Sequence, residues 1–223
     1  MFYGGVKMRS NEDLVQYLKR EGFIKSKKVE EAFLAIDRKD FVPYAYRDEA
    51  YVDEPLPIGE GQTISAPHMV AIMLELASIE EGMNILEIGS GSGYNACLME
   101  YIAYPGTVYT VERQRSLYLI AKGNIKNCPH SKNINTFEGD GSLGLPEYSP
   151  YDRIIVTCGA PEIPPPLIEQ LKVNGIMLIP IGGTYFQELY LIKKKLNGIE
   201  KIDEGSVAFV PLRGKYGYGE NLY

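Results

Sequence analysis

The stretch Asn84–Tyr94, NILEIGSGSGY, decides the fold. A short apolar run leads into glycines at positions 89, 91 and 93, and a helical pattern begins at Tyr94. A buried strand that turns through glycines into a helix is typical of an open α/β sheet, where ligands bind outside the carboxyl ends of the strands. Glycine lets a backbone approach a ligand closely, and a tight turn does not need three glycines. We therefore expect a ligand-binding loop rather than a simple turn.

The spacing of these glycines narrows the choice of ligand. The loop has the pattern GxGxG, and Tyr94 stands where the dinucleotide fingerprint GxGxxG has its third glycine. The loop also lacks the Gly-Lys-Ser/Thr ending of a P-loop. Neither a pyrophosphate nor a triphosphate is therefore favoured, and a nicotinamide-dependent dehydrogenase is a weak alternative.

The chain around this loop alternates between helical and strand-like patterns. Helices are expected over residues 67–76, 94–102, 114–127 and 165–171, and strands over 84–88, 107–111, 134–137, 151–157 and 175–181. This alternation predicts an α/β fold with a doubly wound, mostly parallel sheet and helices on both faces. The strand-like runs at 188–195, 198–203 and 207–211 have no helices between them, so we expect these C-terminal strands to pair antiparallel.

The first 64 residues are organised differently. Helical patterns from Asn11 and over 29–36 have candidate N-caps at Ser10 or Asn11 and near Ser26. An irregular piece over 38–63 is rich in proline and glycine, but its aromatic content argues against disorder. We expect one domain over 1–223, made of N-terminal helices with a lid-like covering segment (1–64), a cofactor-binding α/β core (65–185) and C-terminal strands with a tail (186–223).

Acidic residues follow the next two strands of the core. Glu112 ends one strand and can accept hydrogen bonds from both hydroxyls of a ribose, although it could be an ordinary charged strand end. Asp140, within Gly139–Gly141, could hold the exocyclic amine of an adenine, although it could be a turn residue. Together with the glycine loop, these residues describe a nucleoside site without phosphates. They indicate S-adenosylmethionine and resemble the class I methyltransferases, which have a Rossmann-like fold.

The bulk composition argues against several other classes. A net charge of −6 is unsuited to a protein that binds nucleic-acid backbone, because phosphate binding draws on clustered lysine and arginine. The run Lys193–Lys195 is expected to be a solvated strand edge. Two histidines and three scattered cysteines, without a CxxC motif, offer no credible metal site.

The sequence also bears on location. The first eight residues, MFYGGVKM, lack an apolar stretch of signal-peptide length, and no run approaches the ~20 apolar residues of a membrane span. The odd number of cysteines leaves at least one unpaired within the chain. We therefore expect a cytoplasmic protein that does not associate with membranes, either a monomer or a homo-oligomer.

A second stretch, Asp53–Met69 (DEPLPIGEGQTISAPHM), resembles the signature of the protein-L-isoaspartate O-methyltransferase family. Similar motifs run along nearly the whole chain: DFVP at 40–43, LEIGSGSGY at 86–94, VYTVER at 108–113, GDGSLG at 139–144, PYDRIIVT at 150–157, Ala160-Pro161, EQLK at 169–172, IPIG at 179–182 and FVPLRGKYG at 209–217. Ser90 and Cys158-Gly159 depart from the family pattern, which usually has threonine and two alanines there. All of these residues are small, so the resemblance stands.

The resemblance implies a repair reaction, in which a methyl group passes from S-adenosylmethionine to the free α-carboxylate of an L-isoaspartyl residue in a damaged protein or peptide. The ester then cyclises to a succinimide without the enzyme. A peptide α-carboxylate has a pKa near ~3.5, so the reaction needs no general base, and the sequence shows no obvious catalytic His–carboxylate pair. The implied catalytic residue is Ser65, as a hydrogen-bond donor that aligns the carboxylate; an N-cap for the following helix is the alternative.

The resemblance also implies binding residues. For the cofactor these are Thr63, Ile64, Glu87, Gly89, Ser90, Gly91, Ser92, Gly93, Glu112, Arg113, Asp140 and Gly141. For the substrate they are Ser65, His68 and the extended residues Val207, Ala208, Phe209 and Val210, with a plain core strand as the alternative for the last four. About the first eleven residues of segment 38–63 are expected to cover the cofactor, and the resemblance puts Asp53 and Pro55 in the covering loop.

Two other functions stay open at this point. A class I methyltransferase could act on RNA or a small molecule, but the strand at 151–157 leads into Cys158–Pro161 rather than the (D/N)PP(Y/F) motif that binds a flipped base. A non-catalytic cofactor-binding module is also conceivable, although Ser65 and the glycine loop are intact.

Overall fold

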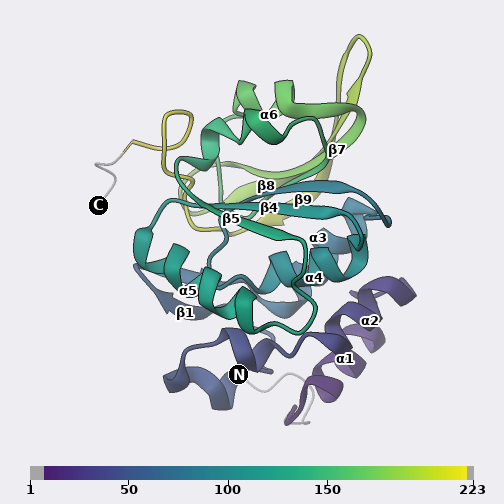
Figure 1. Ribbon diagram of the computed structural model, residues 1–223, viewed down its shortest axis with the longest axis vertical. Coiled ribbons are helices and arrows are strands. Elements are labelled where there is room, and N and C mark those ends of the chain that lie inside the picture. Colours follow the sequence, from purple (N-terminus) through teal and green to yellow (C-terminus); the bar gives the residue numbers. More distant parts are fainter. Residues whose placement is uncertain (1–7, 220–223) are drawn as a thin grey trace.

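The computed structural model describes residues 8–219 (Figure 1). The first seven residues, on which most of the expectation about a signal peptide rests, lie outside this range. No helix in the described part of the chain is long and apolar enough to cross a membrane.

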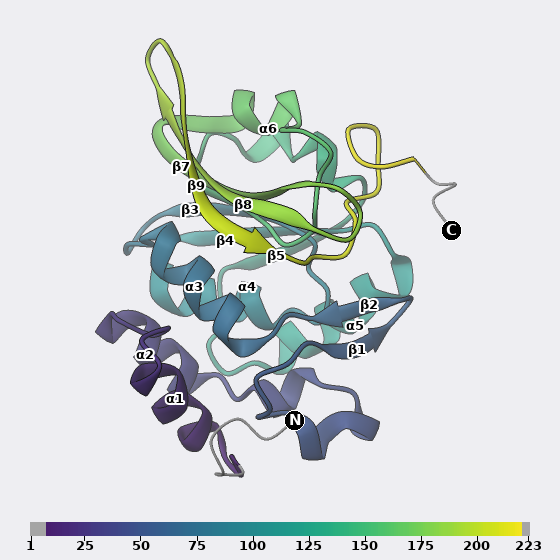
Figure 2. The same ribbon diagram turned by 180° about the vertical axis from the view of Figure 1, so that it is seen from behind.

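One sheet of seven strands forms the centre of the molecule (Figures 1 and 2). Its strands are β3 (Asn84–Ile88), β4 (Thr107–Glu112), β5 (Ile134–Glu138), β6 (Tyr151–Val156), β7 (Leu171–Gly182), β8 (Gln187–Lys195) and β9 (Gly198–Val207). They lie in the order β5-β4-β3-β6-β7-β8-β9. The strands from β5 to β7 pair parallel, and β8 and β9 are added antiparallel, so the predicted mostly parallel sheet with antiparallel C-terminal strands is confirmed.

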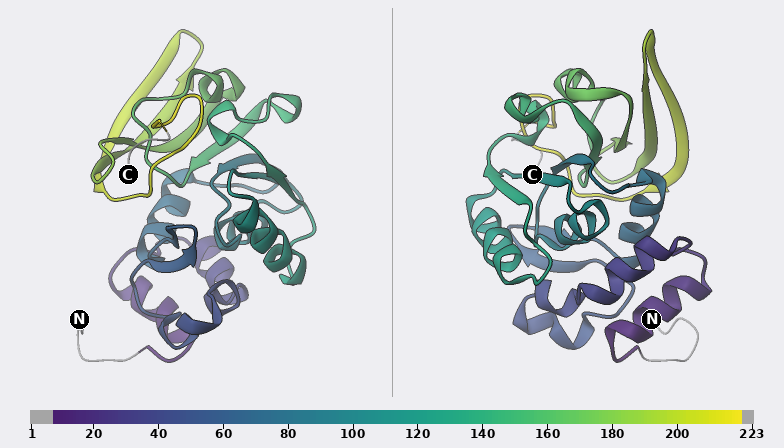
Figure 3. Two further views of the ribbon diagram at one scale, coloured as in Figure 1. Left: turned by 90° about the vertical axis from the view of Figure 1, so that its left-hand side faces the viewer. Right: turned by 45° about the vertical axis from the view of Figure 1, so that its right-hand side comes forward.

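Helices cover both faces of this sheet, as predicted (Figure 3). They are α1 (Asn11–Arg20), α2 (Lys27–Ala35), α3 (Pro67–Ala77), α4 (Tyr94–Ala103), α5 (Arg115–Asn127) and α6 (Pro165–Gln170). Helices α3, α4 and α5 pack on one face, with α1 and α2 below them, and α6 lies on the other face (Figure 1). The side chains of Ser10 and Ser26 accept the amides of Asp13 and Val29, so both expected N-caps are present.

The larger core extends from the sheet through helices α3, α4 and α5 to α1 and α2. Leu98 and Met99 of α4 and Phe33 of α2 are completely buried there. Full burial of a side chain of this kind stabilises a fold by about 1.5–3 kcal/mol. On the other face, the ring of Tyr109 stacks on Tyr148 at 4.7 Å between centroids. Aromatic rings therefore cover part of the face of the sheet on which α6 packs.

The segment 38–63 is more regular than expected. It contains two short 3₁₀ helices, Arg38–Phe41 and Tyr44–Glu49, and an antiparallel hairpin of β1 (Leu56–Gly59) and β2 (Gln62–Ile64). The 3₁₀ helices follow Asp37, whose side chain caps the first one, and Pro43, which starts the second. The cap made by Asp37 and the fixed φ of Pro43 explain why the proline-rich composition did not give an irregular loop.

A separate strand over 207–211 does not form, so this part of the prediction is wrong. Strand β9 ends at Val207, and the chain then crosses the carboxyl edge of the sheet. The Gln187 side chain accepts the amide of Phe209 at 2.7 Å, and Gly159 donates its amide to Val210 at 2.8 Å. The backbone of this segment is thus bonded to a side chain and to a loop instead of to a neighbouring strand.

Candidate active site

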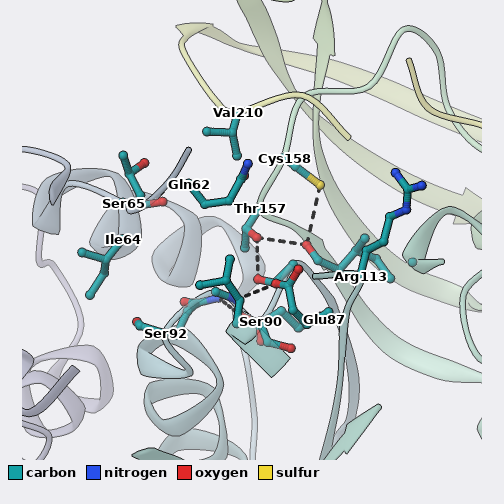
Figure 4. Close-up of a pocket in the computed structure, with 18 of the residues that line it drawn as sticks. Gln62, Ile64, Ser65, Glu87, Ser90, Ser92, Arg113, Thr157, Cys158 and Val210 are labelled. Carbon is teal, nitrogen blue, oxygen red and sulfur yellow. Dashed lines mark hydrogen bonds between the residues drawn. The ribbon is translucent and has the colours of Figure 1, made fainter. Parts of the chain in front are cut away.

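A pocket opens at the carboxyl ends of the parallel strands, where the glycine loop leads into α4 (Figure 4). Its empty volume is ≈ 1000 Å³, including the open mouth. The lining residues are Gln62–Ser65, Val70, Met73, Glu87–Ser92, Tyr94, Asn95, Val111–Gln114, Leu117, Gly141, Thr157, Cys158 and Val210–Arg213. Gln62, Ser65 and Val210 lie at one end of this pocket and Arg113 at the other (Figure 4).

The glycine loop has little room for side chains. Gly89 has a φ of +97°, and a Cβ at this position would collide with the hydroxyl of Thr157. That hydroxyl donates to the carbonyl oxygens of Ile88 at 2.9 Å and Gly89 at 2.8 Å, which fastens the loop to the end of β6. A side chain at position 89 would therefore distort the floor of the pocket.

Glu112, at the end of β4, holds the glycine loop from its other side. Its Oε2 accepts the amide of Gly91 at 3.0 Å, and its Oε1 accepts the amide of Gln114 at 3.0 Å. Each carboxylate oxygen can accept a second hydrogen bond. Glu112 can therefore organise the loop and still bind ribose hydroxyls, as the sequence predicts.

Glu87, one of the residues that line the pocket, is completely buried. Burial raises its pKa to about 7, with a smaller increase from Glu112, against the lowering effect of hydrogen bonds from Thr110 and Asn95. The Asn95 amide nitrogen donates to Glu87 at 2.8 Å, whereas the buried Asn95 Oδ1 has no partner among the described residues. A carboxylate and an unused carbonyl oxygen side by side favour a ligand with a cationic donor group.

The hairpin β1–β2 encloses the pocket at the end that carries Ser65. Residues of β2 line the pocket, and Glu60 of the hairpin turn accepts a hydrogen bond from Ser116 of α5 at 2.7 Å. No residue of segment 38–61 is among the described residues that line the pocket. The covering role predicted for the first part of that segment, and for Asp53 and Pro55, stays a prediction.

Ser65 does not cap α3, so the alternative reading of this residue is wrong. Ala66 occupies the N-cap position without a side-chain hydrogen bond, and Pro67 begins the helix with its φ already fixed. Ser65 lines the pocket, and its carbonyl oxygen accepts a hydrogen bond from Arg38 Nη1 at 2.8 Å. The Ser65 hydroxyl therefore makes no helix-capping hydrogen bond.

A His–carboxylate pair does occur in the described structure, but it lies outside the pocket, so the expectation that the site has no catalytic pair of this kind stays a prediction. His68 Nδ1 and Asp53 Oδ1 are 2.9 Å apart, and the same oxygen accepts the His68 amide at 2.8 Å. Burial alone would raise the pKa of Asp53, but its hydrogen bonds with His68 lower it below the usual value. The pair could not be recognised from the sequence because its two residues are 15 positions apart. Neither residue lines the pocket, so the pair is placed to hold Asp53 against the start of α3.

The other predicted residues divide between the pocket and its surroundings. Thr63, Ile64, Ser65, Glu87, Gly89, Ser90, Gly91, Ser92, Glu112, Arg113, Gly141 and Val210 line it, whereas Gly93, His68, Asp140, Val207, Ala208 and Phe209 do not. The Asp140 carboxylate accepts the amides of Ser142 at 2.9 Å and Lys215 at 2.8 Å. It therefore fastens the segment after Arg213 to the end of β5, and its predicted contact with adenine stays a prediction.

Several lining residues were not predicted from the sequence. Thr157 and Cys158 follow β6, so the rule that ligands bind at strand ends could have found them. Burial raises the pKa of the Cys158 thiol, which makes it a packing group rather than a nucleophile. Asn95 and Leu117 come from helices and carry no local signal in the sequence. No group of three or more potential metal-ligating residues occurs within 8–219.

These features define a class of protein. A mostly parallel sheet with antiparallel C-terminal strands, a GxGxG loop after β3, an acid at the end of β4 and a pocket suited to a cationic nucleoside identify a class I methyltransferase that uses S-adenosylmethionine. The orphaned Asn95 Oδ1 beside Glu87 fits the ammonium group of this cofactor.

Comparisons with known proteins then give the family. Residues 8–217 match the family described as Protein-L-isoaspartate(D-aspartate) O-methyltransferase (PCMT). The protein-L-isoaspartate O-methyltransferase of Thermococcus sibiricus is 54% identical over 93% of this chain and 95% of its own. The chain belongs to the protein-L-isoaspartate O-methyltransferase family.

Solved structures agree with this family. A Plasmodium falciparum protein described as a PCMT, crystallised in complex with S-adenosyl-L-homocysteine, superposes with a TM-score of 0.83 and 31% identity, covering 92% of this chain and 99% of its own. A second structure, named protein-L-isoaspartate O-methyltransferase, has a TM-score of 0.85 and 35% identity, covering 93% and 67%.

Proposed function

We propose that this chain transfers a methyl group from S-adenosylmethionine to the free α-carboxylate of L-isoaspartyl residues in damaged proteins and peptides. The observation that carries the proposal is the position of Ser65. It lines the cofactor pocket, as does Val210 of the segment that crosses the sheet edge (Figure 4). A carboxylate held by this serine would lie within the same cavity as the cofactor.

The acceptor group determines what the protein must do. A peptide α-carboxylate has a pKa near ~3.5 and is ionised at neutral pH, so no residue has to remove a proton. S-adenosylmethionine, when bound, supplies the methyl group on a positively charged sulfur. The task of the chain is to align one carboxylate oxygen and to hold it still. The Ser65 hydroxyl does this as a hydrogen-bond donor, and its charge-assisted bond is the strong kind.

The walls of the pocket contribute by excluding water. Ile64, Val70, Met73 and Leu117 present apolar side chains to it. The carboxylate and the sulfonium lose their opposite charges as the methyl group moves, and a dry site favours a step that removes charge. Ile64 is itself buried, so the hairpin that carries Ser65 also supplies part of this apolar wall.

The cofactor is held by the groups already gathered around the glycine loop. We expect Glu112 to bind the ribose hydroxyls, and Glu87 with Asn95 to bind the ammonium group, and the hydrogen bonds that hold these two carboxylates in place support this assignment. The Ser90 hydroxyl oxygen lies 2.6 Å from the Thr110 hydroxyl oxygen, and the Thr110 hydroxyl donates a hydrogen bond to the Glu87 carboxylate. This chain of hydrogen bonds fixes the Glu87 carboxylate before the ligand arrives, and a preorganised site binds more tightly.

The peptide main chain is expected beside residues 207–210. Ala208 is exposed, Val210 lines the pocket, and Phe209 is buried and anchored through its amide. Recognition through backbone groups in an extended segment is insensitive to side-chain identity. It would let one enzyme repair many damaged sequences. The three buried free cysteines suit a reducing compartment, and we propose the cytoplasm as its location.

Two synthetic peptides that differ only in one L-isoaspartyl or L-aspartyl linkage test the function. With labelled S-adenosylmethionine, we expect methyl transfer to the isoaspartyl peptide alone, and a product that releases its label in base. A third peptide, with the isoaspartyl α-carboxylate blocked as an amide, should accept nothing. Tight cofactor binding without transfer to the isoaspartyl peptide would overturn the proposal and leave a cofactor-binding module or a methyltransferase with another substrate.

A further inference from the structure

Arg38 is a buried cation next to the active site. It is 0% exposed and begins the first 3₁₀ helix of the segment that precedes the hairpin. Burial lowers its pKa to about 10, which still leaves it protonated at neutral pH. Within residues 8–219, no carboxylate forms an ion pair with it, and its Nε has no hydrogen-bond partner.

The guanidinium group instead joins three parts of the site. Its Nη1 donates to the carbonyl oxygen of Ser65 at 2.8 Å, and its Nη2 donates to that of Glu54 at 3.3 Å. Its Cζ lies 5.7 Å from the ring centre of Tyr94, the residue at which the glycine loop becomes α4. One side chain thus contacts the covering segment, the serine and the cofactor-binding helix.

The planar guanidinium group of an arginine is required for these contacts. Burying an isolated cation is costly, and Arg38 offsets only part of this cost through backbone carbonyls. Arginine can donate to two carbonyls in fixed directions, whereas the ammonium of lysine is a point charge. The hydroxyl of Ser65 has no helix-capping bond to orient it, so its direction depends on how its own peptide group is held.

We propose that Arg38 is a positioning residue for methyl transfer, which fixes the Ser65 peptide relative to α4 and thereby aims the Ser65 hydroxyl at the substrate carboxylate. The inference rests on the proposed function. It assigns to Arg38 an effect on the chemical step, and none on the pocket that holds the cofactor.

The fold supplies a matched control in Arg153. This arginine is also buried, at 8% exposed, and its guanidinium donates to the backbone carbonyls of Ala77, Ser78 and Asp152. It lies on β6 and is not among the residues that line the pocket. Arg38→Lys and Arg153→Lys therefore each remove a buried guanidinium group that donates to backbone carbonyls. The first lies near Ser65 and the second at the C-terminal end of α3.

The kinetic comparison separates positioning from stability. Arg38→Lys is expected to lower kcat for the isoaspartyl peptide at least about tenfold, because a displacement of a reacting or aligning group by about 1 Å is costly in a preorganised site. The Kd of S-adenosylmethionine should stay within about threefold of the wild-type value. Arg153→Lys should lower thermal stability with kcat unchanged. An equal kcat loss in both variants would overturn the inference, because it would show a general effect of instability.

A double variant tests whether Arg38 acts through Ser65. In a Ser65→Ala background, Arg38→Lys should change the residual kcat by less than about threefold, because the group it positions is gone. Multiplicative losses would contradict this route. Arg38→Met, which replaces the cation with an apolar chain, keeps the test possible if the lysine variant does not fold, and the same kcat loss is expected. A wild-type enzyme that ignores isoaspartyl peptide would sink the proposed function and this inference with it; wild-type kcat in both Arg38 variants would sink the inference alone.

Discussion

The amide of Asn95 donates a 2.8 Å hydrogen bond to Glu87, while its own carbonyl oxygen is buried without a partner in the described part of the chain. Helix α4 thereby presents an unused acceptor beside a carboxylate whose pKa is raised to about 7 by burial. Both groups gain from a positively charged hydrogen-bond donor. This relationship predicts that cofactor binding depends on the protonation of Glu87.

Cofactor binding should therefore strengthen as the pH rises through 7. The pKa of Glu87 is about 7 without a ligand, and a nearby cation favours the ionised form, so binding releases a proton in this range. Titration calorimetry between about pH 6 and pH 8, in buffers with different ionisation enthalpies, measures both effects. Glu87→Gln should bind more weakly and lose the pH dependence. A wild-type Kd that is constant across this range would contradict the assignment.

Stability should show the opposite trend for the same residue. The folded-state pKa of Glu87 is raised above the value of 4.5 for an unperturbed glutamate, so the stability that it contributes is complete below about pH 4.5 and is lost as the pH rises through 7. Glu87→Gln has no group that titrates at this position, so its stability does not fall for this reason as the pH rises. Its advantage in unfolding free energy over the wild type should grow by roughly 3 kcal/mol between about pH 4.5 and pH 8. Urea unfolding at both pH values checks this, and a difference independent of pH would refute it.

Ser65→Ala should lower kcat for isoaspartyl peptide by about 10–100-fold, the worth of one hydrogen bond to a charged group. Cofactor affinity should change little, because we expect residues of the glycine loop and of β4 to hold the cofactor. Steady-state kinetics together with a direct Kd measurement separates the two. A large loss of cofactor affinity with unchanged kcat would assign Ser65 to the cofactor instead.

Gln187→Leu should raise KM for the peptide several-fold. Gln187 is 2% exposed, donates to Gly183 at 2.6 Å and accepts the amide of Phe209, so its loss frees the segment expected to receive the peptide. The Kd of S-adenosylmethionine should not change. Kinetics with varied peptide concentration measures this effect.

Gln170→Leu is the matched control for that experiment. Gln170 is also buried, and it braces another loop by donating to Leu143 and accepting from Leu145, each at 2.8 Å. Its replacement should reduce stability to a similar extent without raising the peptide KM. If both variants raise KM equally, the role given to Gln187 is wrong.

Much of the fold could be predicted because its signals are local. Strand β3 begins and ends where its apolar run does, and α4 begins at Tyr94, where the glycines end. The capping serines at 10 and 26 act within three residues of themselves. The segment after Val207 was mispredicted because strand propensity does not reveal that a distant glutamine side chain will take a backbone amide.

The same distinction between local signals and contacts of distant residues applies to the candidate site. Most predicted residues at strand ends or in the glycine loop line the pocket, with Gly93 and Asp140 as exceptions, because topology alone brings these positions together. The contacts of Arg38 with Ser65 and of Asp53 with His68 join positions 27 and 15 residues apart. Such pairs depend on how the N-terminal helices pack on the core, which no short motif encodes.

The most direct measurement is the position of the methyl group in the product. An isoaspartyl peptide incubated with the enzyme and S-adenosylmethionine can be fragmented in a mass spectrometer before the ester cyclises. We expect one methyl ester on the α-carboxylate of the isoaspartyl residue, with the aspartyl peptide unmodified and the ester strongly reduced in Ser65→Ala. A methyl group at any other atom, or equal methylation of the aspartyl peptide, would contradict it.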